Sequence, residues 1–437
     1  MDAREARVLY LAVADGRGHL MRAHLLRRVL ALSNLSLDVV TTSDAGRVFL
    51  AGLGTPATVL PGGFALLFDD RHRLQARATE RALAAYIVSP QGIGRDVAQL
   101  VRLARGALFI VNDSLHPAAL ALAAAPGFAG APPVVNLHGD NLWRAAIHNF
   151  DRRAPDWASA TFRRLLETVD SRAFGRIVHS LAPGDRFGVR DGGNRFRLPP
   201  LTAAPLRTRA EARRALGLSA RDRLAAIYLN PHFRDPRLAA HLEAALASAG
   251  FRFHGVSEPW AGRPGWRAFD PTFADVVGAS DLLVSGAGVA ALEQARRAGV
   301  PLLALVGDQP EQTLNLEQAR DAGVEARAVD LPVLTSAAAP PDLASAIDAL
   351  AAAAPPPRAL PDEHARVHRL WRETFLSLAE LTKETDHAND PEITDDRPGA
   401  GDQQPRRWRW RSADRRAKPR PAARAPARPD PAAGVAG

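Results

Sequence analysis

The sequence predicts an α/β protein in two halves, each built around a parallel sheet, and three observations support this fold class. Short apolar segments of strand length alternate with amphipathic helical segments through residues 7–384. A glycine-containing turn joins a strand to a helix near residue 16 and again near residue 287. Residues 199–207 contain three prolines and little hydrophobic periodicity, which is typical of a linker. A chain of 437 residues is long enough to bury two cores of ordinary size.

The first half is predicted over residues 1–198. Expected strands cover residues 7–14, 35–41, 64–68, 107–112, 134–137 and 177–179, and expected helices cover 20–32, 70–86 and 93–104. This alternation predicts parallel pairing, because parallel neighbours need a crossover connection that is usually helical. Open sheets of this kind hold their functional groups beyond the carboxyl ends of the strands.

The second half is predicted over residues 208–384, and a disordered tail is predicted over 385–437. Expected strands cover residues 223–229, 252–256, 266–269, 281–285 and 302–306, and expected helices cover 208–217, 236–249, 289–298, 343–353 and 362–384. From residue 385 the chain is rich in Asp, Pro, Gly and Arg and has almost no aliphatic residues. Such a segment cannot bury enough apolar surface to offset the entropy of ordering, so we expect disorder.

The basic charge is concentrated in one segment of the tail, because residues 405–428 hold ten Lys and Arg and one acid, a net +9 that equals the net charge of the whole chain. The remainder of the chain therefore sums to zero, which argues against nucleic-acid binding by the folded part. Trp408 and Trp410 among arginines are typical of a peptide that adheres to membranes or nucleic acids; a tail without a specific role is the alternative. The first residues lack the features of a signal peptide, and the Ala-, Arg- and Pro-rich composition suggests a bacterial, cytoplasmic protein.

The chain contains no cysteine, which excludes disulfides and thiolate metal sites. No metal or cofactor is expected. The turn at Gly16 and Gly18 lacks the third glycine of a dinucleotide fingerprint, which argues against a nicotinamide cofactor.

The turn after the strand at residues 281–285 is predicted to bind a phosphate group. Small residues there would let an anion approach the first N–H groups of the helix that begins near Val289, where the helix dipole is positive. Glu293 lies about one turn further along, where a carboxylate can accept a hydrogen bond from a ribose hydroxyl. A polar cluster after the next strand suits the hydroxyls of a sugar. The expected donor-binding residues here are Ser285, Gly286, Ala287, Gly288, Val289, Glu293, Asp308, Gln309, Glu311 and Gln312. An ordinary tight turn is the alternative.

This stretch resembles the donor-binding region of GT-B glycosyltransferases. It is closest to the bacterial cell-wall N-acetylglucosaminyltransferase and the related UDP-glycosyltransferases. Residues that match the pattern of that region are Ser285, Gly286, Gly288, Glu293, Gly299, Val300 and Pro301, and Asn315 follows. The resemblance implies two Rossmann-like domains facing each other across a cleft, and a last helix that crosses back onto the first domain. It also implies transfer of a sugar from UDP to an acceptor hydroxyl, with inversion and without a metal.

The resemblance also implies roles for residues of the first half. His19 matches the proposed base in a cleft loop that contains Gly16 and Gly18, and Asp113 matches the acid that orients this base. For Asp113 a second interpretation stays open, a cap of the following helix, for which Ser114 would serve equally well. His116 and His138 are rival cleft histidines, for which a structural or exposed position is the other interpretation.

In the second half, Phe269 has two interpretations, one segment departs from the family, and one loop fits two patterns. Phe269 matches the position whose backbone holds the base, and a core aromatic is the alternative. Where the family has a glycine-rich turn, this chain has Asn230-Pro231-His232-Phe233-Arg234, whose bulk disfavours close approach of a diphosphate. Asn230 is a candidate side-chain donor there. In the later loop, the pair Asp308-Gln309 and the pair Glu311-Gln312 fit two different branches of the family.

Three functions follow from these observations. The first is a glycosyltransferase whose partners are a nucleotide-sugar donor and an acceptor of unknown structure, either a small molecule or a lipid-linked one. A lipid-linked acceptor would bring the protein into peripheral contact with the inner membrane. The alternatives are a nucleotide-sugar 2-epimerase, which needs a constellation of acids that is not evident, and a non-catalytic relative that binds a nucleotide sugar.

Overall fold

The computed structural model describes residues 6–14, 16–60, 67, 69, 75–89, 91–113, 115–124, 130–151, 156–181, 194–307, 309–335, 341–353 and 362–389. Ser114, Asp308, Trp408, Trp410 and most of the strand expected at 64–68 therefore lie outside the described residues. None of the described helices is long and apolar enough to cross a membrane.

The first half contains a parallel sheet of seven strands in the order β3-β2-β1-β4-β5-β6-β7. The strands are β1 (Ala6–Ala12), β2 (Leu35–Thr41), β3 (Ala57–Val59), β4 (Ile110–Asp113), β5 (Val134–Gly139), β6 (Gly175–His179) and β7 (Arg195–Leu198). The short edge strands β3 and β7 were not expected from the sequence. The strand order reverses between β1 and β4, and ligands of open α/β sheets bind at such a switch point. His19 follows β1 and Asp113 ends β4, so both lie at this place.

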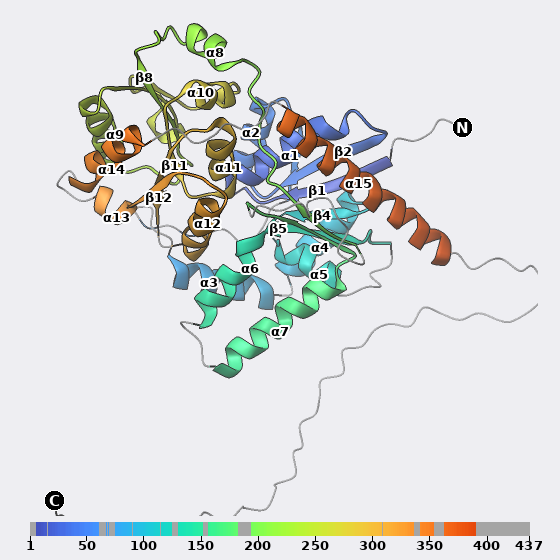
Figure 1. The fold of residues 1–437 in the computed structure, drawn as a ribbon. Helices are drawn as coiled ribbons and strands as arrows, with labels where there is room; N and C mark the ends of the chain where they lie inside the picture. Colours follow the sequence, from blue (N-terminus) through green and yellow to red (C-terminus); the bar gives the residue numbers. More distant parts are fainter. Residues whose placement is uncertain are drawn as a thin grey trace, which may run out of the picture. The chain divides into compact units, whose positions relative to one another are not determined.

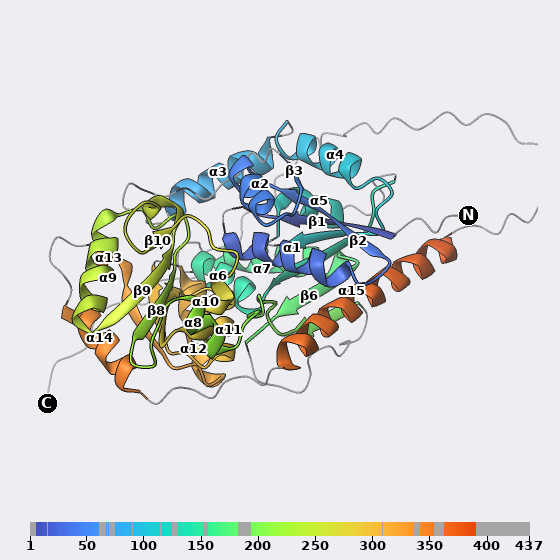
Figure 2. The same ribbon diagram turned by 90° about the horizontal axis from the view of Figure 1, so that it is seen from above.

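Helices cover both faces of the first sheet (Figures 1 and 2). They are α1 (Arg17–Leu30), α2 (Asp44–Gly52), α3 (Ala76–Val88), α4 (Ile93–Leu103), α5 (Pro117–Ala124), α6 (Asp140–Asp151) and α7 (Asp156–Arg172). Leu20 and Leu26 of α1 belong to the apolar cluster on one face, and Leu100 of α4 and Leu122 of α5 belong to the cluster on the other. Strands buried on both faces explain the nearly continuous apolar runs that the sequence shows there.

The second half contains a parallel sheet of six strands in the order β10-β9-β8-β11-β12-β13. The strands are β8 (Arg223–Tyr228), β9 (Phe251–Val256), β10 (Trp266–Arg267), β11 (Leu282–Gly286), β12 (Leu302–Val306) and β13 (Ala326–Asp330). The helices are α8 (Arg209–Ala215), α9 (Pro236–Ser248), the 3₁₀ turn η1 (Glu258–Trp260), α10 (Phe273–Ala279), α11 (Val289–Ala298), α12 (Pro310–Asp321), α13 (Leu331–Leu334) and α14 (Pro341–Ala352). Its switch point lies between β8 and β11, beside Asn230 and Gly286. The predicted α/β class with two parallel sheets is confirmed.

The last helix, α15 (Asp362–Asn389), packs on the first half. Its residues Val367, Trp371, Phe375 and Leu378 join the same apolar cluster as β1 and α1, and Trp371 Nε1 donates to the carbonyl of Pro199 at 2.9 Å. The crossing back that the resemblance implied is therefore present. The predicted second half, 208–384, needs correction, because this helix contributes to the first core. The helix also continues five residues past the expected end at residue 384.

Replacing Trp371 with alanine is expected to destabilise the protein by about 3–5 kcal/mol, because a fully buried aromatic ring and its hydrogen bond are lost. Urea unfolding followed by circular dichroism measures the change. Trp157, whose side chain is 73% exposed on α7, is the matched control. Its alanine variant is expected to stay within about 0.5 kcal/mol of the wild type. Equal losses in the two variants would contradict the packing of α15 described here.

Candidate active site

A cavity of about 1090 Å³ is lined by residues of both halves. Much of its lining comes from segments that follow strands: Gly16 to His19 after β1, Leu115 to Pro117 after β4, Tyr228 to Phe233 at and after β8, and Ser285 to Val289 at and after β11. These are the carboxyl ends of parallel strands, where binding groups of open α/β sheets are placed.

His19 and Asp113 meet at the switch point of the first sheet. His19 stands in the first turn of α1, and its Nδ1 lies 3.1 Å from Oδ1 of Asp113, which is fully buried at the end of β4. His19 itself is 31% exposed and lines the cavity. At the turn after β4, the backbone N–H of His116 donates to Oδ1 of Asn112 at 2.8 Å. The structure thus brings Asp113 to the histidine, and Asn112 serves the backbone of the turn.

Two further residues hold the Asp113 carboxylate, and neither was expected from the sequence. Tyr10 donates its hydroxyl to Oδ2 at 2.6 Å, and Arg22 donates Nη1 to Oδ1 at 3.1 Å. Burial alone would raise the pKa of Asp113, but the charges of Arg22 and His19 and the hydrogen bonds from His19 and Tyr10 outweigh it and lower the pKa. Arg22 could have been found in the sequence, because it lies three residues after His19 on the same helix face.

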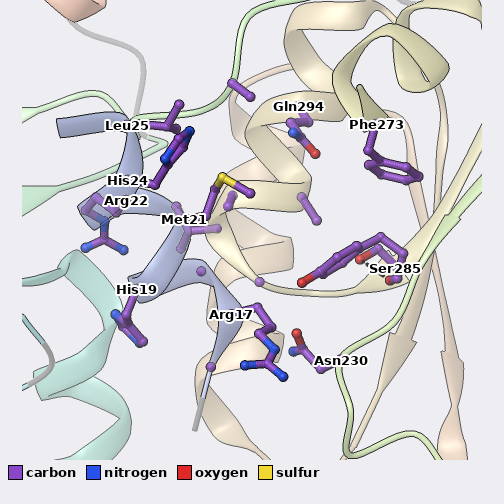
Figure 3. A pocket seen from close by; sticks show the side chains of 18 of the residues that line it. Arg17, His19, Met21, Arg22, His24, Leu25, Asn230, Phe273, Ser285 and Gln294 are labelled. Atoms are coloured by element: carbon purple, nitrogen blue, oxygen red, sulfur yellow. Dashed lines mark hydrogen bonds between the residues drawn. The ribbon is translucent and has the colours of Figure 1, made fainter. Parts of the chain in front are cut away.

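The ionised carboxylate decides which nitrogen of His19 carries the proton. An ionised carboxylate can only accept, so Nδ1 of His19 must be the donor in this contact. In the neutral ring the lone pair then resides on Nε2, the nitrogen that can take a proton. Figure 3 shows His19 and Arg22 on one side of α1, and Arg17 and Met21 on the side nearer to α11.

The two glycines of this loop differ in the space around them. A methyl group on Gly16 would lie 3.3 Å from Cδ2 of His19, whereas nothing lies within 4 Å of a methyl group on Gly18. Gly16→Ala is therefore expected to displace the imidazole and lower kcat about 10-fold, since small misplacements of a reacting group are costly. Gly18→Ala is the matched control and should retain most of the activity. Steady-state kinetics on the two variants check this, and equal rates would contradict the contact.

The first turn of α11 faces the cavity without a side-chain cap. Its N-cap is Gly288, no side chain caps it, and its first turn contains no acid. By contrast, Ser43, Thr208 and Asp235 cap α2, α8 and α9 with their side chains. The amides at the start of α11 and their dipole are thus suited to an anion. Gly288 has open space around its Cα, and the ring of Phe233 lies 3.7 Å from a methyl group placed on Gly286. Bulk from the 230–234 segment thus stands beside Gly286.

Ser285 and Ala287 hold this turn through backbone and amide contacts. Ser285 donates its hydroxyl to the carbonyl of Tyr228 at 2.9 Å, and the carbonyl of Ala287 accepts from Nδ2 of Asn315 at 3.1 Å. Oδ1 of Asn315 in turn accepts from Nδ2 of Asn141 in the first half at 3.0 Å. Side chains from α6 and α12 therefore link the turn before α11 to the first half, a link that sequence patterns do not reveal.

The position of Glu293 differs from the expectation. Its carboxylate is 1% exposed and is held by Arg296, with Nε at 2.8 Å, and by Arg297, with Nε at 2.5 Å. It does not line the cavity, whereas the next residue, Gln294, does. The expected ribose contact of Glu293 is therefore corrected: the side chain faces the two arginines, because a helix turns about 100° per residue and directs its neighbour to the cavity instead.

The polar cluster after β12 lies at the cavity, apart from Asp308, which is outside the described residues. Gln309, Glu311 and Gln312 all line the cavity. The pair Asp308-Gln309 and the pair Glu311-Gln312, which fit different branches of the family, therefore both contribute at least one residue to its lining. Gln312 accepts from the N–H of Gly307 at 2.7 Å and donates to Gln309 at 3.3 Å. Burial raises the pKa of Glu311, against the charge of His19 and a hydrogen bond from Asn315.

Phe269 and Asn230 also line the cavity. Phe269 packs edge-on against Phe49 of α2, with ring centroids 5.7 Å apart, so it joins the two halves in addition to lining the cavity. Arg17 lies over Phe49, 4.6 Å from the ring centroid, and donates to Glu258 of the second half. This Arg17–Glu258 contact was not expected from the sequence, because its partners are 241 residues apart.

The rival histidines have structural partners. His138 donates Nδ1–H to the carbonyl of Gly139 at 2.9 Å, so its Nε2 accepts from the indole of Trp143 at 2.8 Å. Nδ1 of His116 accepts from the N–H of Ala118 at 3.2 Å, and burial lowers the pKa of His116 to about 4. Within the described residues, no group of three or more His, Asp or Glu side chains is arranged to hold a metal ion.

No protein-family model and no curated protein sequence matches the chain. Solved structures do match it in fold. The glycotransferase of kitacinnamycin matches with a TM-score of 0.51 at 16% identity, over 87% of this chain and 99% of that one. The glycosyltransferase VinC in complex with dTDP matches with a TM-score of 0.52 at 15% identity, over 86% and 100%.

The spinosyn rhamnosyltransferase SpnG matches with a TM-score of 0.50 at 15% identity, over 87% of this chain and its whole length. Each of these likenesses covers more than four fifths of the chain. The chain therefore has the two-domain GT-B fold of these glycosyltransferases, as the residues around Gly286 led us to expect.

Proposed function

We propose that the protein is a glycosyltransferase that moves a sugar from a nucleoside diphosphate, with UDP as the predicted carrier, to an acceptor hydroxyl. One observation carries the proposal: the oriented imidazole of His19 and the uncapped start of α11 line the same cavity. The imidazole supplies a base, and the start of α11 supplies a site for negative charge. Such a transfer requires both groups.

In the proposed reaction, Nε2 of His19 takes the proton of the acceptor hydroxyl while the acceptor oxygen bonds to the anomeric carbon. The bond from that carbon to the diphosphate oxygen breaks, and the diphosphate leaves with the electron pair. Attack opposite to the leaving group inverts the anomeric configuration. Asp113 stabilises the imidazolium that forms, because its buried carboxylate stays ionised beside Arg22.

The leaving diphosphate is proposed to bind at the amides of residues 288–290, where the helix dipole offsets its charge and no metal is needed. Gln294 takes the place expected for Glu293 near the ribose, and Phe269 is the proposed neighbour of the base. Gln309, Glu311 and Gln312 are proposed to bind hydroxyls of the sugar. These assignments rest on the cavity lining and on the resemblance of residues 285–315.

A thermal-shift panel of UDP, dTDP, GDP and ADP tests the donor side. A nucleotide at 100 times its Kd is expected to add about 2.7 kcal/mol of stability, and UDP should give the largest shift. Release of free UDP from UDP-sugars is then measured with a panel of acceptor alcohols and phenols. No shift with any nucleoside diphosphate would overturn the proposal.

A non-catalytic binding protein is the second candidate, and the ring of Phe233 beside Gly286 favours it. It predicts a nucleotide shift without release of UDP for any acceptor. An epimerase instead predicts an isomeric UDP-sugar without added acceptor, which chromatography of the donor detects.

A further inference from the structure

The cavity extends from the turn at residues 285–289 along the side of α1 that is opposite to His19, and it reaches α15. Six residues define this extension, which we name the basic arm: His24, Arg28 and Leu32 at and beyond the end of α1, and His368, Arg369 and Arg372 on α15. None of the six has a role in the proposed transfer. Helix α1 rises about 1.5 Å per residue, so Arg28 stands about 14 Å along the axis from His19.

Helical spacing directs these side chains to one place. His24, Arg28 and Leu32 follow each other at intervals of four, and His368 and Arg372 have the same interval, so each set forms one stripe on its helix. Both stripes line the same cavity, and α1 packs beside α15 (Figure 2). Figure 3 shows His24 on α1 near Met21, on the side of the helix opposite to His19.

The basic arm carries positive charge from three arginines. Within the described residues, Arg28, Arg369 and Arg372 form no ion pair. By contrast, Arg296 and Arg297 of α11 are paired with Glu293.

The pKa values of the two histidines in the basic arm are lowered by burial and by nearby positive charge. Burial and the charges of Arg28 and Arg27 lower the pKa of His24, and burial, Arg297 and Arg28 lower that of His368 against one backbone hydrogen bond. No carboxylate contributes at either ring. Unbalanced cations along the wall of a cavity attract an anion strongly, because the low-dielectric protein focuses their field.

Two exposed leucines line the same cavity as these cations. Leu32 is 78% exposed and Leu206, in the segment that joins the two halves, is 77% exposed, and both line the cavity. Exposed leucines are ordinary when single, but two that line a cavity add exposed apolar surface to its wall. The cavity thus offers apolar surface as well as three guanidinium groups.

We propose that the basic arm binds a single amphiphilic molecule, its phosphate or carboxylate on Arg28, Arg369 and Arg372 and its apolar part on Leu32 and Leu206. Guanidinium groups form paired hydrogen bonds to such oxyanions, which a lone cation cannot match. The occupant is one dissolved molecule and not a bilayer, because the arginines line the wall of a cavity. The site is separate from the start of α11 and does not depend on the transferase proposal.

Isothermal titration of the full chain with octyl phosphate, below its micelle concentration, tests the site. The variant R28Q/R369Q/R372Q is expected to bind it about tenfold or more weakly, because charge-assisted contacts are lost. R102Q/R214Q/R366Q removes three exposed arginines that do not line the cavity and should bind as the wild type does. Binding of octyl phosphate should also weaken as salt is added.

Two further probes separate head group from chain. Octyl glucoside has the same chain without charge and is expected to bind more weakly and equally to both variants. Inorganic phosphate has the charge without the alkyl chain. Leu32→Ser should therefore weaken the binding of octyl phosphate and leave the affinity for inorganic phosphate unchanged.

Equal affinity of the two triple variants for octyl phosphate would overturn the proposal. So would loss of octyl phosphate binding at saturating UDP, which would place the ligand in the donor site. Binding to phosphatidylglycerol vesicles without binding of octyl phosphate would show a membrane surface instead. The UDP thermal shift should be the same in both triple variants, so failure of this site is distinguishable from failure of the donor site.

Discussion

Replacing His19 with alanine is expected to lower the rate of sugar transfer by about 10²–10⁴-fold, the range that a positioned general base contributes. The affinity for UDP should change little, because the proposed diphosphate contacts come from α11 and not from α1. Initial rates of UDP release and a thermal shift with UDP measure the two quantities separately. An alanine variant that keeps the wild-type kcat would contradict the role of His19 as the base.

Three other variants sharpen this test. His148 is exposed at the end of α6, and His148→Ala removes an imidazole without touching the cavity, so it should keep full activity. Asp113→Asn places an amide beside Nδ1, which can donate to that nitrogen and favour the wrong tautomer. We expect it to lose nearly as much activity as His19→Ala. Tyr10→Phe leaves the carboxylate and its contact with His19 in place and should lose much less.

Gly288→Leu is expected to weaken UDP binding by about 100-fold or more. The backbone of Gly288 (φ −79°, ψ 145°) suits any residue, and nothing lies within 4 Å of an added methyl group, so a side chain fits without strain. It would occupy the space in front of the first amides of α11. Hydrogen bonds to a charged group contribute about 1.5–3 kcal/mol each, so loss of two accounts for this change.

The measurement is a UDP titration followed by calorimetry, with Gly94→Leu as the matched control. Gly94 lies on α4, has nothing within 4 Å and does not line the cavity. Both variants should unfold at nearly the wild-type temperature without nucleotide. Unchanged UDP affinity in a folded Gly288→Leu protein would mean that the diphosphate binds elsewhere.

Periodic features of the sequence predicted most of the fold. Alternating strands and helices indicated two parallel sheets, and the prolines near residue 200 marked the segment between them. The edge strands β3, β7 and β13 were missed, because three to five residues at a sheet edge carry no distinct pattern. The end of α15 was placed five residues early, since local composition changes there before the helix ends.

The candidate site was predictable where its chemistry is local to the chain. Gly286 and Gly288 between a strand and a helix, and His19 after a glycine turn, are visible in a single stretch of sequence. The direction of the Glu293 side chain was not predictable, because the ion pairs with Arg296 and Arg297 hold its carboxylate away from the cavity. Whether Asp113 would meet His19 depended on β1 and β4 becoming neighbours, which the sequence suggested only by resemblance.

The sequence by itself determined the α/β class, the two glycine turns and the concentration of positive charge at residues 405–428, because each depends on residues close together in the chain. Tertiary structure alone decided that Tyr10 and Arg22 hold Asp113, that Arg17 pairs with Glu258, and that α1 and α15 bring arginines to one cavity. These contacts join residues on separate elements or successive turns, and only the packing of sheets and helices sets such distances.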